Sequence, residues 1–282
     1  MLTVFFVFIF GAIVGSFLNV VIFRLGTGKS VVKGSSKCLS CGCNLRWYEL
    51  IPIISFFARR GKCAHCGCRI SGQYPAVEAV TGLVFLLVFN FFAGGGLAFG
   101  RQFAFYGFLP VAYYWAIFSV LVLVSVYDIR HQVIPNRITT LFASLSFFSF
   151  VFRVNRPDLF SDPTLSGGIL SGLGLFAFFA ALWFFSKGKA MGMGDAKLAA
   201  GIGLLLGFPD SITTVFFAFW LGAITGILLL FFSKLSEARG AGLRGFPEKK
   251  YNMKSKIPFG PFLALGALIA FLVGSRVIGL YI

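Results

Sequence analysis

The stretch that decides the fold class is residues 2–24, LTVFFVFIFGAIVGSFLNVVIFR, which contains no charged residue before Arg24. About 20 apolar residues in a helix cross a hydrocarbon core of about 30 Å, so this run predicts a membrane-spanning helix. The whole chain agrees, because 58% of its 282 residues are hydrophobic, only 12% are charged, and the mean hydropathy is +0.89. A water-soluble domain carries about a quarter charged residues, so that class is excluded.

Seven further apolar segments follow along the chain, so we expect an all-α polytopic membrane protein with about eight transmembrane helices. The fourth and sixth segments are short. The sixth is expected to be a half-depth helix that its neighbours bury, because lipid does not tolerate unpaired backbone groups. The expected spans are 2–23, 76–93, 104–127, 138–152, 165–185, 196–208, 211–233 and 258–280.

The formal net charge of +16 suggests a nucleic-acid binder, but the positions of the charges indicate membrane orientation instead. If the N-terminus faces outward, 20 of the 25 Lys and Arg residues fall in the inward connections, and Lys197 lies just inside the sixth span. Such an excess of basic residues marks the cytoplasmic side. We therefore expect a lipid bilayer and no nucleic acid as partner. The inward connections are 24–75, 128–137, 186–195 and 234–257.

The expected first span is not a cleaved secretory signal. No basic residue precedes it and Arg24 follows it directly, whereas a signal peptide has its positive charge in front of the apolar region. The segment is therefore expected to be retained.

All six cysteines lie in the first inward connection, in two nearly identical motifs, CLSCGC at 38–43 and CAHCGC at 63–68. Two CxxC pairs at this separation are typical of a four-thiolate zinc site, since each tight turn aims two sulfurs at one tetrahedral ion. The glycine after the second cysteine of each pair suits the turn. We expect the ligands of Zn²⁺ to be Cys38, Cys41, Cys63 and Cys66.

The alternative for these thiols is disulfide bonding, which the reducing cytoplasmic side disfavours. Cys43 and Cys68 exceed the four ligands that a tetrahedral ion takes, so they are either spare thiols or competing ligands. His65 is expected to face solvent. Because so short a segment buries little core, a bound metal would stabilise it. The predicted domains are the first transmembrane helix at 1–23, a cytoplasmic zinc-binding insertion at 24–75, and a membrane bundle at 76–282.

Two acidic residues stand out because apolar sequence surrounds them. Asp128 follows the third expected span in SVYDIRHQVIPN (125–136), and Asp195 precedes the sixth in MGMGDAKL (191–198). Two membrane crossings separate them, so both return to the inner face at similar depth. Glu49 and the other acids of the connections are expected to be solvated. A carboxylate within a bilayer costs a few kcal/mol, so such residues usually have a function or a partner.

The residues alone leave three interpretations of this pair open. Two carboxylates at equal depth can share one proton and hydrolyse a peptide, one acting as base toward water and the other as acid. They can instead form salt bridges with Arg130 or Lys197, or serve proton or ion transport. Gly192 and Gly194 favour the peptidase, because a backbone without side chains lets an extended peptide pair with it.

Taken together, the motifs make this chain resemble the prepilin peptidases, the bifunctional leader peptidases of type IV pilus and type II secretion systems. The resemblance covers almost the whole length. The GxGD element alone is only moderately specific, but its combination with the paired cysteine motifs is very specific. The matching segments are GSFLNVVIFR (15–24), LIPIISFFARRGKC (50–63), QYPAVEAVTG (73–82), the Asp128 segment with IPN, GMGDAKL (192–198) and IPFGPFLALG (257–266).

The resemblance implies that Asp128 and Asp195 are the catalytic aspartates, with Gly192, Gly194 and Lys197 completing the motif of the second. The substrates would be prepilins and pseudopilins, cut after a short basic leader at the cytoplasmic face of the bacterial inner membrane. The family also methylates the new N-terminal residue with S-adenosylmethionine, an activity associated with the cysteine loop. A peptidase without methyltransferase activity and a membrane transporter with paired carboxylates are the alternatives.

The chain departs from the family pattern at two places. Asn136 stands where many members have Asp, and Cys43 and Cys68 extend the usual set of four cysteines. Glu78 is a candidate helper in methyl transfer, although a carboxylate near a helix N-terminus is also favourable by itself. Pro258 and Pro261 bound the last expected span and are candidates for the wall of the site.

Overall fold

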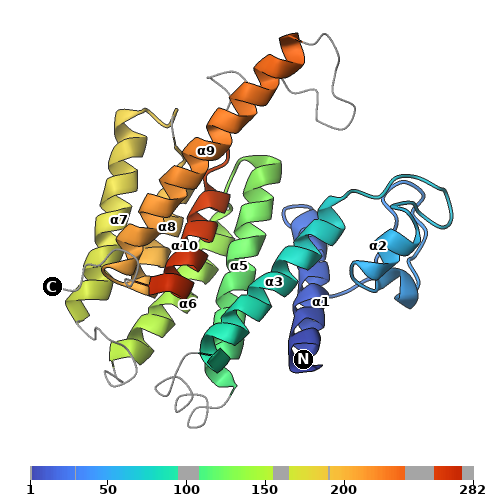
Figure 1. The fold of residues 1–282 in the computed structure, drawn as a ribbon, viewed down its shortest axis with the longest axis horizontal. Helices are drawn as coiled ribbons and strands as arrows, with labels where there is room; N and C mark the ends of the chain where they lie inside the picture. The colour runs from blue at the N-terminus through green and yellow to red at the C-terminus, as the bar shows by residue number, and fades with distance from the viewer. Residues whose placement is uncertain are drawn as a thin grey trace. The chain divides into compact units, whose positions relative to one another are not determined.

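The computed structural model describes residues 2–28, 30–94, 108–154, 165–189, 191–238 and 257–274. Within these ranges the chain is helical, apart from loops with two isolated antiparallel bridges, and it contains no strand. The all-α class is therefore confirmed (Figure 1). The long helices are α1 (Leu2–Arg24), α3 (Gln73–Gly94), α5 (Leu109–His131), α6 (Asn136–Val154), α7 (Leu165–Phe185), α8 (Met193–Leu206), α9 (Asp210–Ala238) and α10 (Gly260–Val273).

Each expected membrane segment coincides with one of these helices. Five of them, α1, α3, α5, α7 and α9, are long and apolar enough to cross a membrane, so the chain is a multi-pass membrane protein. The helix α10 is apolar but has 14 residues, and α8 also has 14. The count of about eight crossings stays a prediction. Most of the connection 234–257 and the end of the last expected span lie outside the described residues.

The unit Met1–Val126 is built on the pair α1 and α3. These helices approach closely because glycines lie at their contact: a Cβ at Gly11 would be 2.8 Å from the Cα of Gly82. Small residues at such contacts are typical of membrane helices. The first part of α5 packs on α3 through Trp115. Its ring stacks on that of Phe85, with 4.6 Å between the ring centroids, and its Nε1 donates to the Phe85 carbonyl at 3.0 Å.

A long connection between α1 and α3 carries the cysteines, together with the 3₁₀ helix η1 (Trp47–Leu50) and the short α2 (Ile54–Ala58). Arg24, the last residue of α1, folds the start of this connection back on itself. Its guanidinium donates to the carbonyls of Ser30, Lys33 and Ser35 at 2.7, 3.1 and 3.2 Å. The basic residue that ends the first span therefore also shapes the loop that follows it.

The unit Tyr127–Ile282 is arranged around α8, which contacts α6, α7, α9 and α10. Nine of the 14 residues of α8 are buried, which confirms that its neighbours cover this short segment. Gly203 allows the contact with α7, since a Cβ there would lie 2.7 Å from the Cα of Gly172. Because α8 is enclosed, a polar side chain at its start is held away from bulk solvent.

The contacts divide the chain within α5, between Val126 and Tyr127. The division into 1–23, 24–75 and 76–282 separates the chain by function rather than by packing, and it stays a prediction.

Candidate functional site

The two aspartates singled out by the sequence lie at helix ends in the unit Tyr127–Ile282. Asp128 is in the last turn of α5 and Asp195 is in the first turn of α8. Both are buried, with 5% and 8% of their surface exposed, and they are close enough for the charge of Asp128 to act on the Asp195 carboxyl group. The structure thus brings together two carboxyl groups that are 67 residues apart in sequence.

The start of α8 holds Asp195 in place. Gly192 precedes the helix in extended conformation, and its N–H donates to Asp195 Oδ2 at 3.0 Å. A carboxylate at the third helical position that bonds back to the N-cap amide stabilises a helix start. The other oxygen, Oδ1, is buried and takes no hydrogen bond from any described residue. The main chain therefore fixes one oxygen of Asp195 but not the other.

Asp128 is held by a different helix. Its Oδ2 accepts a hydrogen bond of 3.0 Å from the N–H of Gly260, the first residue of α10. The chain turns away directly after Asp128: α5 ends at His131, Gln132 adopts a left-handed φ of 54°, and Pro135 precedes α6. Pro258 and Pro261 flank Gly260, so the segment expected to form a wall does lie beside Asp128.

Two further residues of the GxGD segment have neighbours in the connection between α5 and α6. A Cβ at Gly194 would lie 2.9 Å from the Cβ of Ile134, so close packing requires a glycine there. Lys197 is exposed, and its Nζ donates to Asn136 Oδ1 at 2.8 Å. Lys197, considered above as an ion-pair partner of the aspartates, is thus engaged by Asn136. Asn136, where the resemblance led us to expect an aspartate, therefore still serves as an acceptor for Lys197.

The cysteine loop contains two copies of one turn. Cys38 N–H donates to the Cys43 carbonyl at 3.0 Å and Gly42 N–H to the Cys38 carbonyl at 2.9 Å. The second copy repeats these bonds between Cys63, Gly67 and Cys68 at 2.9 and 3.0 Å. Both glycines have the left-handed φ that such a turn requires, 71° for Gly42 and 68° for Gly67.

The two turns face each other, so the predicted ligand atoms converge. The Sγ atoms of Cys38, Cys41, Cys63 and Cys66 all lie within 4.8 Å of one another, and those of Cys38 and Cys66 are 4.0 Å apart. A tetrahedral zinc ion with Zn–S bonds of about 2.3 Å separates its sulfurs by about 3.8 Å. The donor set and its spacing therefore fit Zn²⁺, and all six cysteines are free thiols rather than disulfides.

The turns favour the thiolate at the first cysteine of each pair, whereas burial and the neighbouring thiols raise the pKa of Cys41 and of Cys66. The N–H groups of Cys41 and Ser40 hydrogen-bond to Cys38 and lower the pKa of its thiol to about 6. The N–H groups of Cys66 and His65 lower the pKa of Cys63 in the same way. Cys68 lies beside the predicted ligands, with its Sγ 3.6 Å from that of Cys38. It is therefore positioned as a competing ligand rather than a distant spare thiol.

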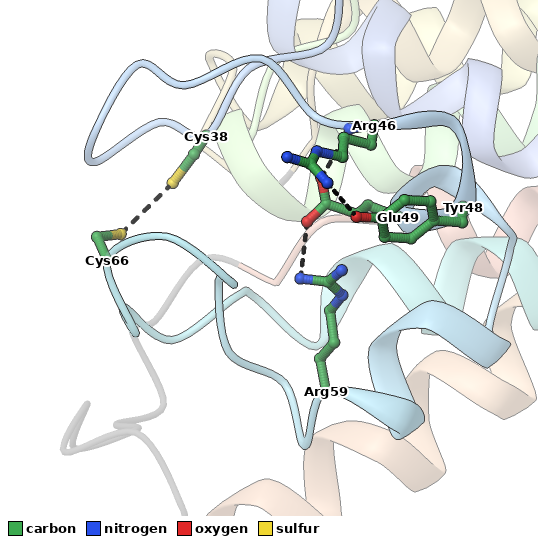
Figure 2. Close-up of polar contacts among 6 residues, drawn as sticks. All are labelled: Cys38, Arg46, Tyr48, Glu49, Arg59 and Cys66. Atoms are coloured by element: carbon green, nitrogen blue, oxygen red, sulfur yellow. Dashed lines mark hydrogen bonds and ion pairs between the residues drawn. The ribbon is translucent and has the colours of Figure 1, made fainter.

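An ion-pair framework supports the loop beside the cluster (Figure 2). Glu49 accepts the N–H of Arg46 at 2.6 Å and pairs with Arg59 at 2.7 Å, while the Arg46 guanidinium donates to the Tyr48 hydroxyl at 3.1 Å. The Glu49 side chain is only 4% exposed. The expectation that Glu49 is a solvated carboxylate is therefore wrong, because the arginine ten residues later was not recognised as its partner.

Glu78 attaches the loop to the helices of its own unit. It is buried on α3, its Oε2 accepts the N–H of Ile53 at 2.7 Å, and it hydrogen-bonds to the Ser16 side chain on α1. Nearby on α1, the fully buried Asn19 donates to the carbonyl of Tyr74 at 3.2 Å. Glu78 thus has a structural role that explains its burial, and its part in methyl transfer stays a prediction.

The sequence alone did not identify Gly260 as a neighbour of Asp128. The available signal was a glycine at the start of an apolar helix, with Pro258 two residues before it and Pro261 directly after it.

Comparisons with known proteins agree with this architecture. Residues 9–92 match the Bacterial Peptidase A24 N-terminal domain, and residues 115–227 match the Type IV leader peptidase family. A prepilin leader peptidase/N-methyltransferase of Bacillus subtilis (strain 168) is 32% identical over 275 residues, which cover 98% of this chain and 96% of the relative. The chain belongs to the type IV leader peptidase family.

Other members of the type IV leader peptidase family with the same name resemble the chain as well. The Myxococcus xanthus (strain DK1622) protein is 34% identical over 225 residues, which are 80% of this chain and 62% of the relative. The Stutzerimonas stutzeri protein is 28% identical over 299 residues, covering 97% of this chain and 92% of the relative. No solved structure gives a significant match to the chain.

Proposed function

We propose that this protein is a prepilin leader peptidase in which Asp128 and Asp195 are the catalytic residues. The observation that carries the proposal is a pair of buried carboxyl groups in one packed unit, each with one oxygen held by a glycine amide. The names of the relatives support prepilins and pseudopilins as substrates, because these proteins are called prepilin leader peptidase/N-methyltransferase.

The mechanism follows from two carboxyl groups that share one proton. The ionised carboxylate removes a proton from a water molecule, and the water oxygen bonds to the carbon of the scissile peptide while the protonated partner donates to the carbonyl oxygen. The C–N bond then breaks as the leaving nitrogen takes up a proton. Asp195 Oδ1, buried and without a partner among the described residues, is the atom best placed to receive the water.

We propose that the cut is made at the cytoplasmic face of the bacterial inner membrane. Asp128 lies in the last turn of α5 and Asp195 in the first turn of α8, and the distribution of basic residues predicts that both helix ends are on the inward side. The prepilin's basic leader precedes its apolar helix, so a site at this depth lets the helix stay in the bilayer while the leader is removed.

The second proposed activity is methylation of the new N-terminal amine, with S-adenosylmethionine as methyl donor. The proposed zinc ion, held by Cys38, Cys41, Cys63 and Cys66, would stabilise the loop that is associated with this reaction. The amine nitrogen attacks the methyl carbon of the sulfonium, the S–C bond breaks, and the amine releases a proton.

Mass spectrometry of the cleaved product tests both activities at once. Purified protein is incubated with a prepilin, with and without S-adenosylmethionine, and the N-terminal peptide is analysed for cut position and methyl mass. Asp128→Asn and Asp195→Asn should each abolish cleavage while the protein still accumulates in membranes. Asp210→Asn, at the start of α9, is the matched control and should cleave normally. Cleavage by either of the first two variants rejects the pair, and ion flux through vesicles without proteolysis would indicate a transporter.

A further inference from the structure

The contact between α10 and Asp128 is a buried hydrogen bond between groups 132 residues apart in sequence. Gly260 N–H donates to Asp128 Oδ2 at 3.0 Å, and both residues are buried. The first N–H groups of a helix have no acceptor within the helix, and in apolar surroundings an unpaired N–H is costly. Asp128 supplies the missing acceptor, so the carboxylate and the helix start stabilise each other.

The position requires glycine because of space rather than backbone conformation. A Cβ at residue 260 would lie 2.8 Å from Asp128 Oδ2 and 3.4 Å from its Cβ and Cγ. The first distance is shorter than any ordinary contact, and no left-handed φ occurs at Gly260. Any larger residue would therefore push the Asp128 carboxyl group out of its place.

The arrangement at Asp195 is similar, because the N–H of Gly192 holds its Oδ2 at 3.0 Å. We propose that Gly260 is a positioning residue, whose amide fixes one oxygen of Asp128 so that the other faces the water and the scissile carbonyl. This inference rests on the proposed peptidase function. The start of α10 then has for Asp128 the role that Gly192, the N-cap of α8, has for Asp195. The orientation of the two aspartates is thus set by α5, α8 and α10.

Kinetics of Gly260→Ala test this role, with Gly222→Ala as the matched control. Gly222 lies on α9 beside α10, but a Cβ there would meet Phe262 at an ordinary distance of 3.6 Å. In Gly260→Ala, kcat for prepilin cleavage should fall on the order of 100-fold, as expected for a catalytic group displaced by about 1 Å, with KM nearly unchanged. Gly222→Ala should keep both constants. A wild-type kcat in Gly260→Ala overturns the inference, whereas failure of the wild-type protein to cleave overturns the proposed function instead.

Hydrogen exchange provides a test that does not depend on the folding of Gly260→Ala. Pro258 and Pro261 carry no amide hydrogen, so a peptide covering 257–263 reports on few amides, Gly260 among them. Its exchange should be slow in the wild-type protein and faster in Asp128→Ala, which removes the acceptor, but unchanged in Asp195→Ala. Equal exchange in the wild-type protein and Asp128→Ala would show that Asp128 does not hold this amide.

Discussion

At the scale of single residues, three carboxylates on the described helices are held by main-chain amides, whereas Glu49 in the cysteine loop pairs with Arg59. Asp128, Asp195 and Glu78 accept N–H groups from Gly260, Gly192 and Ile53, respectively. An amide donor satisfies a carboxylate without neutralising its charge, whereas a buried lysine or arginine would form an ion pair. The aspartates therefore remain available for proton transfer.

The sixth cysteine leads to a prediction about metal binding. Because Cys68 Sγ lies 3.6 Å from Cys38 Sγ, we expect Cys68 to replace Cys66 as a zinc ligand when Cys66 is removed. Cys66→Ser should therefore retain about one zinc ion per chain, while Cys66→Ser combined with Cys68→Ser should lose most of it. Elemental analysis of the purified proteins measures the content, and Cys43→Ser is the control. Loss of zinc in Cys66→Ser alone would mean that Cys68 cannot act as a ligand.

At the scale of elements, glycines set the distances between helices. In the unit Tyr127–Ile282, Gly203 of α8 contacts the backbone of α7 at Gly172, and Gly266 of α10 contacts the backbone of α9 at Thr214. The contact at Gly203 lets α7 cover α8, the helix that begins beside Asp195.

A methyl group at this helix contact should destabilise the protein. In Gly203→Ala the new Cβ would lie 2.7 Å from backbone atoms of Gly172, which cannot move as a side chain can. Overpacking of this kind costs about 1–3 kcal/mol, so the thermal unfolding temperature in detergent should fall. Gly174→Ala places its Cβ in open space and should unfold like the wild-type protein. Equal stability of the two variants would show that α7 and α8 can separate at little cost.

The sequence was sufficient to locate these helices but not all of their contacts. Hydropathy identified each long helix, and the repeated CxxC motif identified four converging thiols. The start of α8 was placed only approximately, because the first turn containing Asp195 is less apolar than the rest. The bond between Gly260 and Asp128 could not be predicted, since it depends on the packing of segments that are far apart in the chain. The burial of Glu49 was missed because local composition does not reveal a partner in a folded loop.

At the scale of the whole molecule, the candidate chemistry falls in two separately packed units. The cysteine cluster and Glu78 belong to Met1–Val126, and both aspartates belong to Tyr127–Ile282. A chain divided in this way can lose one activity without the other.

This division predicts that the zinc site can be removed without loss of proteolysis. Replacing Cys38 and Cys63 with serine takes one ligand from each turn and should release the metal. The loop should then be digested faster by added protease and methylation should be lost, while prepilin cleavage stays near the wild-type rate. Product mass and limited proteolysis measure these effects, and Cys43→Ser is again the control. Loss of cleavage together with methylation would show that the two reactions depend on one another.

The Arg24 side chain meets two separate requirements. A positive charge at the end of α1 favours the orientation with this end on the inward side. The planar guanidinium also donates hydrogen bonds to three carbonyls of the following loop. Lysine would supply the same positive charge at the end of α1. Its compact ammonium group would not reach all three carbonyls that the Arg24 guanidinium bonds. The tolerance of this position to substitution is therefore set by the loop rather than by insertion into the membrane.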